Sequence, residues 1–256
     1  MAPPKDIARS YPKRGMTADL GFRNEPTFCS DGAIEFVGYG SGGGPFINYS
    51  LNKTFSAFTV ASWVLIDGKS TYNYFMSAGG GGSFGGVISF GWINGTTNPE
   101  LRLQDSKKGN AHIPSQTFPE VKGQWCHVAC TINSAGDSIK MYVNGIEATG
   151  LTQPTSGNEV ELPGSDGSSV AHFNVGSFQF SSSAQTLGIG GKMANFGLYD
   201  AELTQEQIIQ LMRGNDFATC SAVATPAVFF ELFENNTEST GNAGAVSDTG
   251  TPYYGY

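Results

Sequence analysis

Five residues between positions 72 and 102 have the side-chain types that proteins use to hold sugars: Trp92, Asn94, Tyr72, Tyr74 and Arg102. A flat aromatic ring can cover the apolar face of a sugar, while amide and charged groups bond to its hydroxyls. Asn94 follows Trp92 by two residues, and the other three lie in apolar runs on either side. The pattern predicts a glycan-binding site, although a tryptophan in an apolar run also commonly packs in the core.

Catalysis has much weaker support in the sequence. Hydrolysis of a glycoside needs two carboxylates about 5–10 Å apart, and the acidic residues here stand singly along the chain. The three histidines, His112, His127 and His172, do not neighbour a G-x-S-x-G turn or a similar nucleophile motif. We therefore expect no catalytic residues.

The segment "WCHVACTI" places two cysteines and a histidine close together. In a strand, Cys126 and Cys130 lie about 13 Å apart on one face, whereas a disulfide needs Cα atoms within about 7 Å. His127 points to the opposite face, so the three side chains cannot share one zinc ion. We expect both cysteines to be buried free thiols.

Apolar residues alternate along most of the chain between positions 33 and 198, which is the period of half-buried strands. The run 58–66 places Phe58, Val60 and Val64 on one face, with Trp63 and Leu65 on the other, as in a central strand. Similar runs are 33–38, 72–77, 86–93, 100–104, 170–176 and 193–200. The pattern predicts an all-β fold with two antiparallel sheets packed as a sandwich.

One segment, 203–214, favours a helix near the C-terminal end of this core. Thr204 and Gln207 have the spacing of a capping box, and Gly214 can take the left-handed conformation that ends many helices.

The overall composition narrows the class of partner. The chain has 256 residues, 35 of them glycine, only 14% charged residues and a formal net charge of −8. Such a surface repels nucleic acid and anionic membranes. The first twenty residues do not have the apolar stretch of a secretory signal, and no run is long enough for a membrane helix.

The combination "W-x-H-V-A-x-T", a Gly/Asp turn and "Y-V-N-G" resembles the signature of laminin-G-like, or concanavalin A-like, jelly-roll domains. "GAIEFVG", "FTVASWV" and "IGGKMANFGLYDAELTQEQIIQLM" resemble the opening and closing parts of that family in the same order. The resemblance covers residues 31–214. It implies a structural role for the signature residues Trp125, His127, Tyr142, Asn144 and Gly145, with function on rim loops or the concave sheet.

The resemblance also implies a cofactor, because laminin-G-like domains often hold calcium at the rim with carboxylate and carbonyl oxygens. Asp67, Asp105 and Asp137 are the candidates, and the alternative is that each shapes a turn. The laminarinase-like branch of the family carries E-x-D-x-x-E on one strand, and this motif is missing here. We therefore expect a non-catalytic protein rather than a glycoside hydrolase relative.

Two polar segments flank the expected sandwich, an N-terminal arm of residues 1–30 and a C-terminal tail of residues 215–256. Within the tail, "AVFFELFENN" (227–236) is apolar on both faces of a strand, so we expect it to complete a sheet in its own domain or in a neighbouring copy. The arms favour a lectin-like module on a phage or virus particle or a similar assembly, in contact with itself or other subunits. The alternative is a stand-alone carbohydrate-binding protein.

Overall fold

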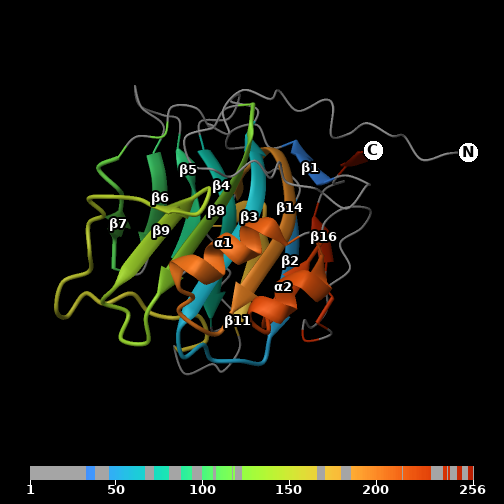
Figure 1. The fold of residues 1–256 in the computed structure, drawn as a ribbon. Helices are drawn as coiled ribbons and strands as arrows, with labels where there is room; N and C mark the ends of the chain where they lie inside the picture. The colour runs from blue at the N-terminus through green and yellow to red at the C-terminus, as the bar shows by residue number, and fades with distance from the viewer. Residues whose placement is uncertain are drawn as a thin grey trace, which may run out of the picture.

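The fold is a β-sandwich with two helices on one side (Figure 1). The computed structural model describes residues 33–37, 46–66, 72–80, 88–93, 100–105, 108–116, 118, 123–165, 171–179, 186–214, 216–231, 239–240, 242, 247–249 and 253–255. The expected N-terminal arm, residues 1–30, lies outside these residues.

In the described part of the chain, the first sheet, sheet A, has eight strands. Its order is β10 (Ile146–Glu147), β9 (Ile139–Val143), β8 (Trp125–Ile132), β3 (Phe58–Ile66), β14 (Gly190–Tyr199), β1 (Ala33–Val37) and β17 (Tyr253–Gly255), and β15 (Val228–Phe230) also pairs with β14.

The second sheet, sheet B, has seven strands among the described residues. Its order is β16 (Ser247–Thr249), β2 (Phe46–Leu51), β11 (Ala171–Val175), β4 (Tyr72–Gly80), β5 (Ile88–Ile93), β6 (Glu100–Asp105) and β7 (Asn110–His112). A separate two-stranded ribbon joins β12 (Ser177–Gln179) to β13 (Thr186–Gly188). The strand pairs are antiparallel, and the predicted jelly-roll sandwich is confirmed.

The main core lies between the two sheets and follows the alternation of the sequence. On β3, Phe58, Val60 and Val64 are buried in this core, whereas Trp63 belongs to a second cluster on the opposite face of sheet A. Burying apolar area at about 25 cal/mol per Å² is the main stabilising term in such a sandwich. The prediction of a central strand that is apolar on both faces is therefore confirmed.

Helices α1 (Gln205–Arg213) and α2 (Phe217–Val223) cover the outer face of sheet A (Figure 1). The predicted helix α1 has the expected capping box, in which Thr204 accepts from the Gln207 amide and the Gln207 side chain accepts from the Thr204 amide. The left-handed stop at Gly214 is wrong, because this residue is extended with φ −74°. A Cβ there would lie 2.8 Å from Cys220 Sγ, so glycine allows α2 to pack closely.

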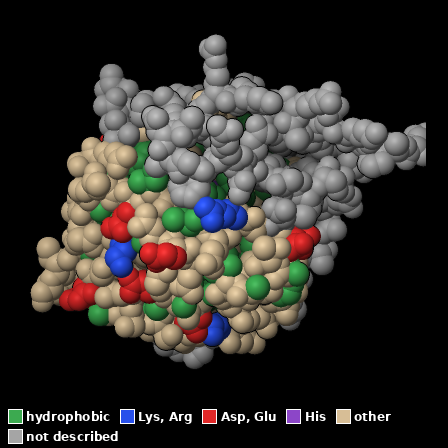
Figure 2. All heavy atoms as spheres, in the orientation of Figure 1, with side chains coloured by type: hydrophobic (Ala, Val, Ile, Leu, Met, Phe, Trp, Pro, Cys, Tyr) green, Lys and Arg blue, Asp and Glu red, His purple; other side chains and the backbone are tan. Residues whose placement is uncertain are grey.

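Helix α2 was not expected from the sequence, which predicted one helix. Asp216 caps it by accepting from the Thr219 amide at 2.7 Å. On the face that carries both helices, Figure 2 shows basic side chains as isolated groups among acidic and neutral ones.

The C-terminal segment continues the sandwich beyond residue 214. Strand β15 pairs with β14 in the same chain, and the Ala227 amide donates to Leu198 O at 2.7 Å. Val228, Phe229 and Phe230 are each at most 1% exposed. The apolar tail strand thus lies in cis in this structure, and exchange with a neighbouring copy stays a prediction. Among the described helices, none has the length and apolar character needed to cross a membrane.

Candidate functional site

Three neighbouring strands of sheet B bring most of the predicted sugar-binding residues onto one face. In the register of β4, β5 and β6, Tyr74 pairs with Gly91 and Gly91 pairs with Arg102. The next row on the same face is Tyr72, Ile93 and Glu100. We call these two rows the tyrosine platform. They lie on the outer face of sheet B, because Trp92 of β5 and Leu101 of β6, the intervening residues, belong to the core between the sheets.

The two tyrosines form a parallel aromatic pair. Their ring centroids lie 6.4 Å apart with an interplanar angle of 4°. Tyr72 is 39% exposed, whereas Tyr74 is 4% exposed. Burial raises the pKa of Tyr74, an effect that the charge of Arg102 partly opposes, so its phenol is neutral. The platform therefore offers one open ring, supported from the side by a second.

Gly91 gives the Tyr74 ring room to lie across β5. A Cβ at this position would lie 2.8 Å from the Tyr74 ring and 2.6 Å from the backbone oxygen of Asn73, closer than atoms can pack. Any larger residue would displace the ring or the strand. The glycine is thus part of the platform, although the sequence reasoning did not single it out.

Arg102 and Glu100 place charge beside the tyrosines. Arg102 Nη2 lies 3.2 Å from Glu100 Oε2, and the two side chains are 26% and 30% exposed. Arg102 Nε is buried and has no hydrogen-bond partner among the described residues. Because the ion pair uses only part of the guanidinium, β6 offers further N–H donors and a carboxylate acceptor on the same face as the open ring, with β5 between them.

Trp92 does not belong to the platform, and its prediction as a sugar-stacking residue is wrong. Its exposed fraction is 0%, and its indole packs edge-on to the Phe118 ring at 5.9 Å inside the core. Trp92 pairs with Asn73 and Leu101, the inward positions of the neighbouring strands, so strand alternation turns it away from Tyr74 and Arg102. Asn94 lies outside the described residues.

Two of the three aspartates considered for calcium, Asp105 and Asp137, lie in the described part of the chain, and each accepts a hydrogen bond from a residue close to it in the sequence. Asp105 is fully buried at the end of β6 and accepts from the Lys108 amide at 3.0 Å. Asp137 is exposed in the β8–β9 turn and accepts from Asn133 Nδ2 at 2.7 Å. Asp67 lies outside the described residues. Among described side chains, no group of three His, Cys, Asp or Glu residues could hold a metal ion, and calcium stays a prediction.

The signature residues hold strands β8 and β9 together. The His127 amide donates to Asn144 Oδ1 at 2.9 Å, and the Asn144 amide donates to His127 O at 2.8 Å. Asn144 and Gly145 both have positive φ, 51° and 78°, as a tight turn requires. Trp125 and Tyr142 are buried, at 7% and 1% exposure.

Burial disfavours the charged forms of His127 and of the cysteines beside it. Burial lowers the pKa of His127 to about 3, and its ring packs edge-on to Trp63 at 5.5 Å. Burial also raises the pKa of Cys126 to about 11, although a hydrogen bond with Asn144 opposes the shift, and it raises the pKa of Cys130. The prediction that Cys126 and Cys130 are buried and not bonded to each other is confirmed.

Comparison with known proteins places this geometry in a family context. A family model described as the concanavalin A-like lectin/glucanases superfamily matches residues 40–209. A heptameric SAP-like pentraxin from Limulus polyphemus has 14% sequence identity and a TM-score of 0.57, over 85% of this chain and 94% of the pentraxin chain. A protein from Bacteroides ovatus, provisionally assigned as carbohydrate binding, has 18% identity and a TM-score of 0.59, over 87% of this chain and 61% of its own. A comparison with curated protein sequences gave no match.

Proposed function

Because the chain belongs to the concanavalin A-like lectin/glucanases superfamily, we propose that it is a non-catalytic, lectin-like module that binds carbohydrate on the tyrosine platform. The observation that carries this proposal is the parallel pair of Tyr72 and Tyr74 next to the Arg102–Glu100 ion pair. An open ring can cover the C–H face of a sugar, while the guanidinium and carboxylate bond to its hydroxyl groups.

The position of the platform supports this role. Both described helices pack on sheet A, so they leave the outer face of sheet B clear of helical cover. The assignment of the Bacteroides ovatus protein with the same fold as carbohydrate binding agrees with the proposal.

The non-catalytic part of the proposal rests on the number of carboxylates. Glycoside hydrolysis needs an acid and a base or nucleophile on opposite sides of the bond. Among the described residues of the two platform rows, Glu100 is the single acid, and it is held by Arg102. A glycoside hydrolase relative is therefore the less favoured reading, and release of reducing ends from polysaccharides above a buffer blank would support it.

The setting that we propose is the surface of a phage or virus particle, or a similar assembly, in which further copies or other subunits are partners. This part rests on the sequence, namely the polar segments 1–30 and 215–256 and the abundance of glycine. The neighbouring genes test the setting. Genes for particle components would support it, whereas genes for sugar uptake would favour a stand-alone carbohydrate-binding protein.

The experiment compares wild type, Tyr72→Ala and Ile146→Ala on a glycan array, followed by titration with the strongest ligand. Ile146 is a matched control, because it is a large apolar residue with 40% exposure, on a strand of sheet A. We expect Tyr72→Ala to weaken binding about tenfold, through the lost stacking, and Ile146→Ala to leave it unchanged. Both melting temperatures should stay within about 2 °C of wild type, since the substitutions are at the surface. Equal binding by wild type and Tyr72→Ala would contradict the proposal.

A further inference from the structure

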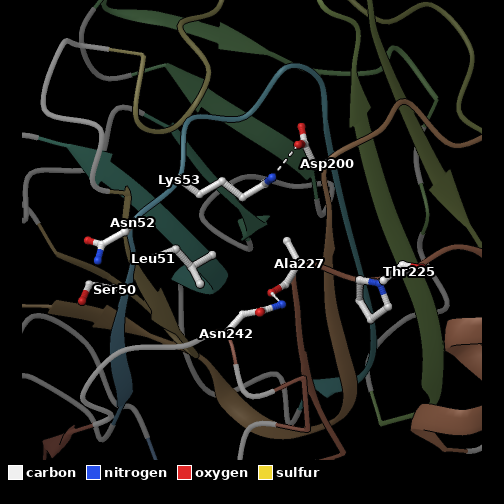
Figure 3. A pocket seen from close by; sticks show the side chains of 9 residues that line it. Ser50, Leu51, Asn52, Lys53, Asp200, Thr225, Ala227 and Asn242 are labelled. Atoms are coloured by element: carbon white, nitrogen blue, oxygen red, sulfur yellow. Dashed lines mark hydrogen bonds and ion pairs between the residues drawn. The ribbon is translucent and has the colours of Figure 1, made fainter.

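A polar pocket lies away from the tyrosine platform, where the loop after β2 meets the C-terminal segment (Figure 3). Its volume is about 480 Å³, within the range of about 300–1,000 Å³ that is typical of small-molecule sites. Its polar lining comes from distant parts of the chain: Ser50, Asn52, Lys53, Asp200, Thr225 and Asn242. None of these residues belongs to the platform.

The charges of the pocket compensate one another. Lys53 Nζ lies 2.7 Å from Asp200 Oδ2, and Asp200 Oδ1 accepts from the Ser56 amide and hydroxyl at 2.7 and 2.9 Å. Burial raises the pKa of Asp200, but these bonds outweigh it and hold the pKa below its ordinary value, so the carboxylate stays charged. Figure 3 shows the Lys53 side chain extending toward Asp200. Among the described lining residues, no other side chain carries charge.

The remaining lining groups are of two kinds. Hydroxyl and amide side chains can donate hydrogen bonds to a ligand and accept them from it. Leu51, Pro226 and Ala227 supply the apolar part of the lining. A charge-compensated pocket of this composition favours a ligand with many hydroxyl groups and no net charge, because an anion would meet the fixed Asp200 carboxylate as well as Lys53.

One wall of the pocket is built by the C-terminal segment. Asn242 Nδ2 and Thr240 Oγ1 both donate to Ala227 O, at 3.1 and 3.3 Å, and the Ala227 amide is bonded to the end of β14. The pocket therefore exists only when the segment that leads to β15 is docked on the sandwich. A ligand that binds there stabilises this docked state by mass action.

We propose that this pocket is a second binding site, for a neutral mono- or disaccharide, that the docked C-terminal segment completes. It is independent of the platform, so either site can fail while the other stands. The site links ligand binding to the docking of residues 225–227 and of Asn242, and the sugar protects the chain at residues 225–231 from proteolysis.

The test measures binding of neutral mono- and disaccharides and of glucuronate to four proteins: wild type, Lys53→Met, Lys140→Met and Tyr72→Ala. Lys140 is the matched control, because it also pairs with one carboxylate, that of Glu202, at 2.9 Å. The side chains of Lys140 and Glu202 are 40% and 31% exposed, and those of Lys53 and Asp200 are 37% and 26% exposed. We expect Lys53→Met to raise the Kd of a neutral sugar about three- to tenfold, the effect of losing one hydrogen-bond donor. Lys140→Met should leave it unchanged, and Tyr72→Ala should retain this binding event.

Three results would overturn the second site: Lys53→Met binding every sugar as wild type does, Tyr72→Ala abolishing all sugar binding, or glucuronate binding better than its neutral counterpart. The second result would leave the proposed function intact. Conversely, if one sugar-binding event depends on Lys53 and no binding event depends on Tyr72, the result would support the pocket and remove the platform. Limited proteolysis gives an independent readout, because a saturating neutral sugar should slow cleavage within residues 225–231 in wild type more than in Lys53→Met.

Discussion

Replacing Trp92 by alanine tests whether this side chain is core or ligand platform. A buried tryptophan removes about 150–250 Å² from water, and Trp92 is fully buried next to Phe118. Emptying such a site costs about 3–5 kcal/mol of unfolding free energy. For a chain of this size, each kcal/mol lowers the melting temperature by about 2–4 °C, so we expect Trp92→Ala to lower it by about 6–20 °C. Urea denaturation and a thermal melt measure both quantities.

A second substitution at the same position makes this prediction sharper. Trp92 Nε1 is buried with no hydrogen-bond partner among the described residues, so phenylalanine keeps most of the ring contact and removes an unpaired donor. Trp92→Phe should therefore cost less than half as much as Trp92→Ala. The reasoning would be refuted if Trp92→Ala lost less than about 1 kcal/mol and also lost glycan binding, because an exposed sugar platform behaves that way.

Three further predictions concern stability. His127 has an ordinary pKa of 6.5 and a folded pKa of about 3, so the unfolded chain binds its proton first, and stability falls as the pH drops below about 6.5. Between pH 7 and 5, wild type should lose about 2 kcal/mol more than His127→Gln in urea denaturation, and parallel losses would contradict this. Gly136→Ala should lower the free energy of unfolding by about 1–3 kcal/mol more than Gly157→Ala, because both residues have positive φ but only Gly136 contacts the backbone of Val160. Equal losses in the same assay would contradict this packing argument. Truncation after Gly214 removes the buried Phe229 and Phe230 and should give insoluble or unfolded protein. An intact fold that no longer assembles would support exchange of the tail strand between copies. A soluble, equally stable monomer would refute both closure in the same chain and exchange.

The longer strands of the sandwich, such as β3, β6 and β14, were predictable because their apolar residues alternate with the period of a strand. Strand β3 shows this most clearly, since one face contributes to the core between the sheets and the other to separate clusters on the outer face of sheet A. Helix α1 was equally predictable from its capping box. Helix α2 was not, because its seven residues FATCSAV carry no periodic apolar face and only one, Cys220, is buried. Gly214 packs against that helix, and such a tertiary contact cannot be read from the local sequence.

The site was predictable in its chemistry but only partly in its geometry. Tyr72, Tyr74 and Arg102 were recognised by residue type, and they do share a face. Trp92 was misplaced because the sequence does not give the register between strands, and register decides which residues share a row. The irregular pairing between Tyr74 and Met76 adds to the difficulty. The polar pocket is harder still, because Lys53 and Asp200 are far apart in the chain and belong to no motif.

The central claim is that carbohydrate binds on the tyrosine platform, and the most direct test is an NMR titration with the strongest ligand from the array. The account predicts that the backbone amides of Tyr72, Gly91 and Arg102 show large chemical-shift changes that saturate with a single Kd, while those of helix α1 stay unchanged. Changes confined to the helices and sheet A, with these three amides unaffected at saturation, would contradict it.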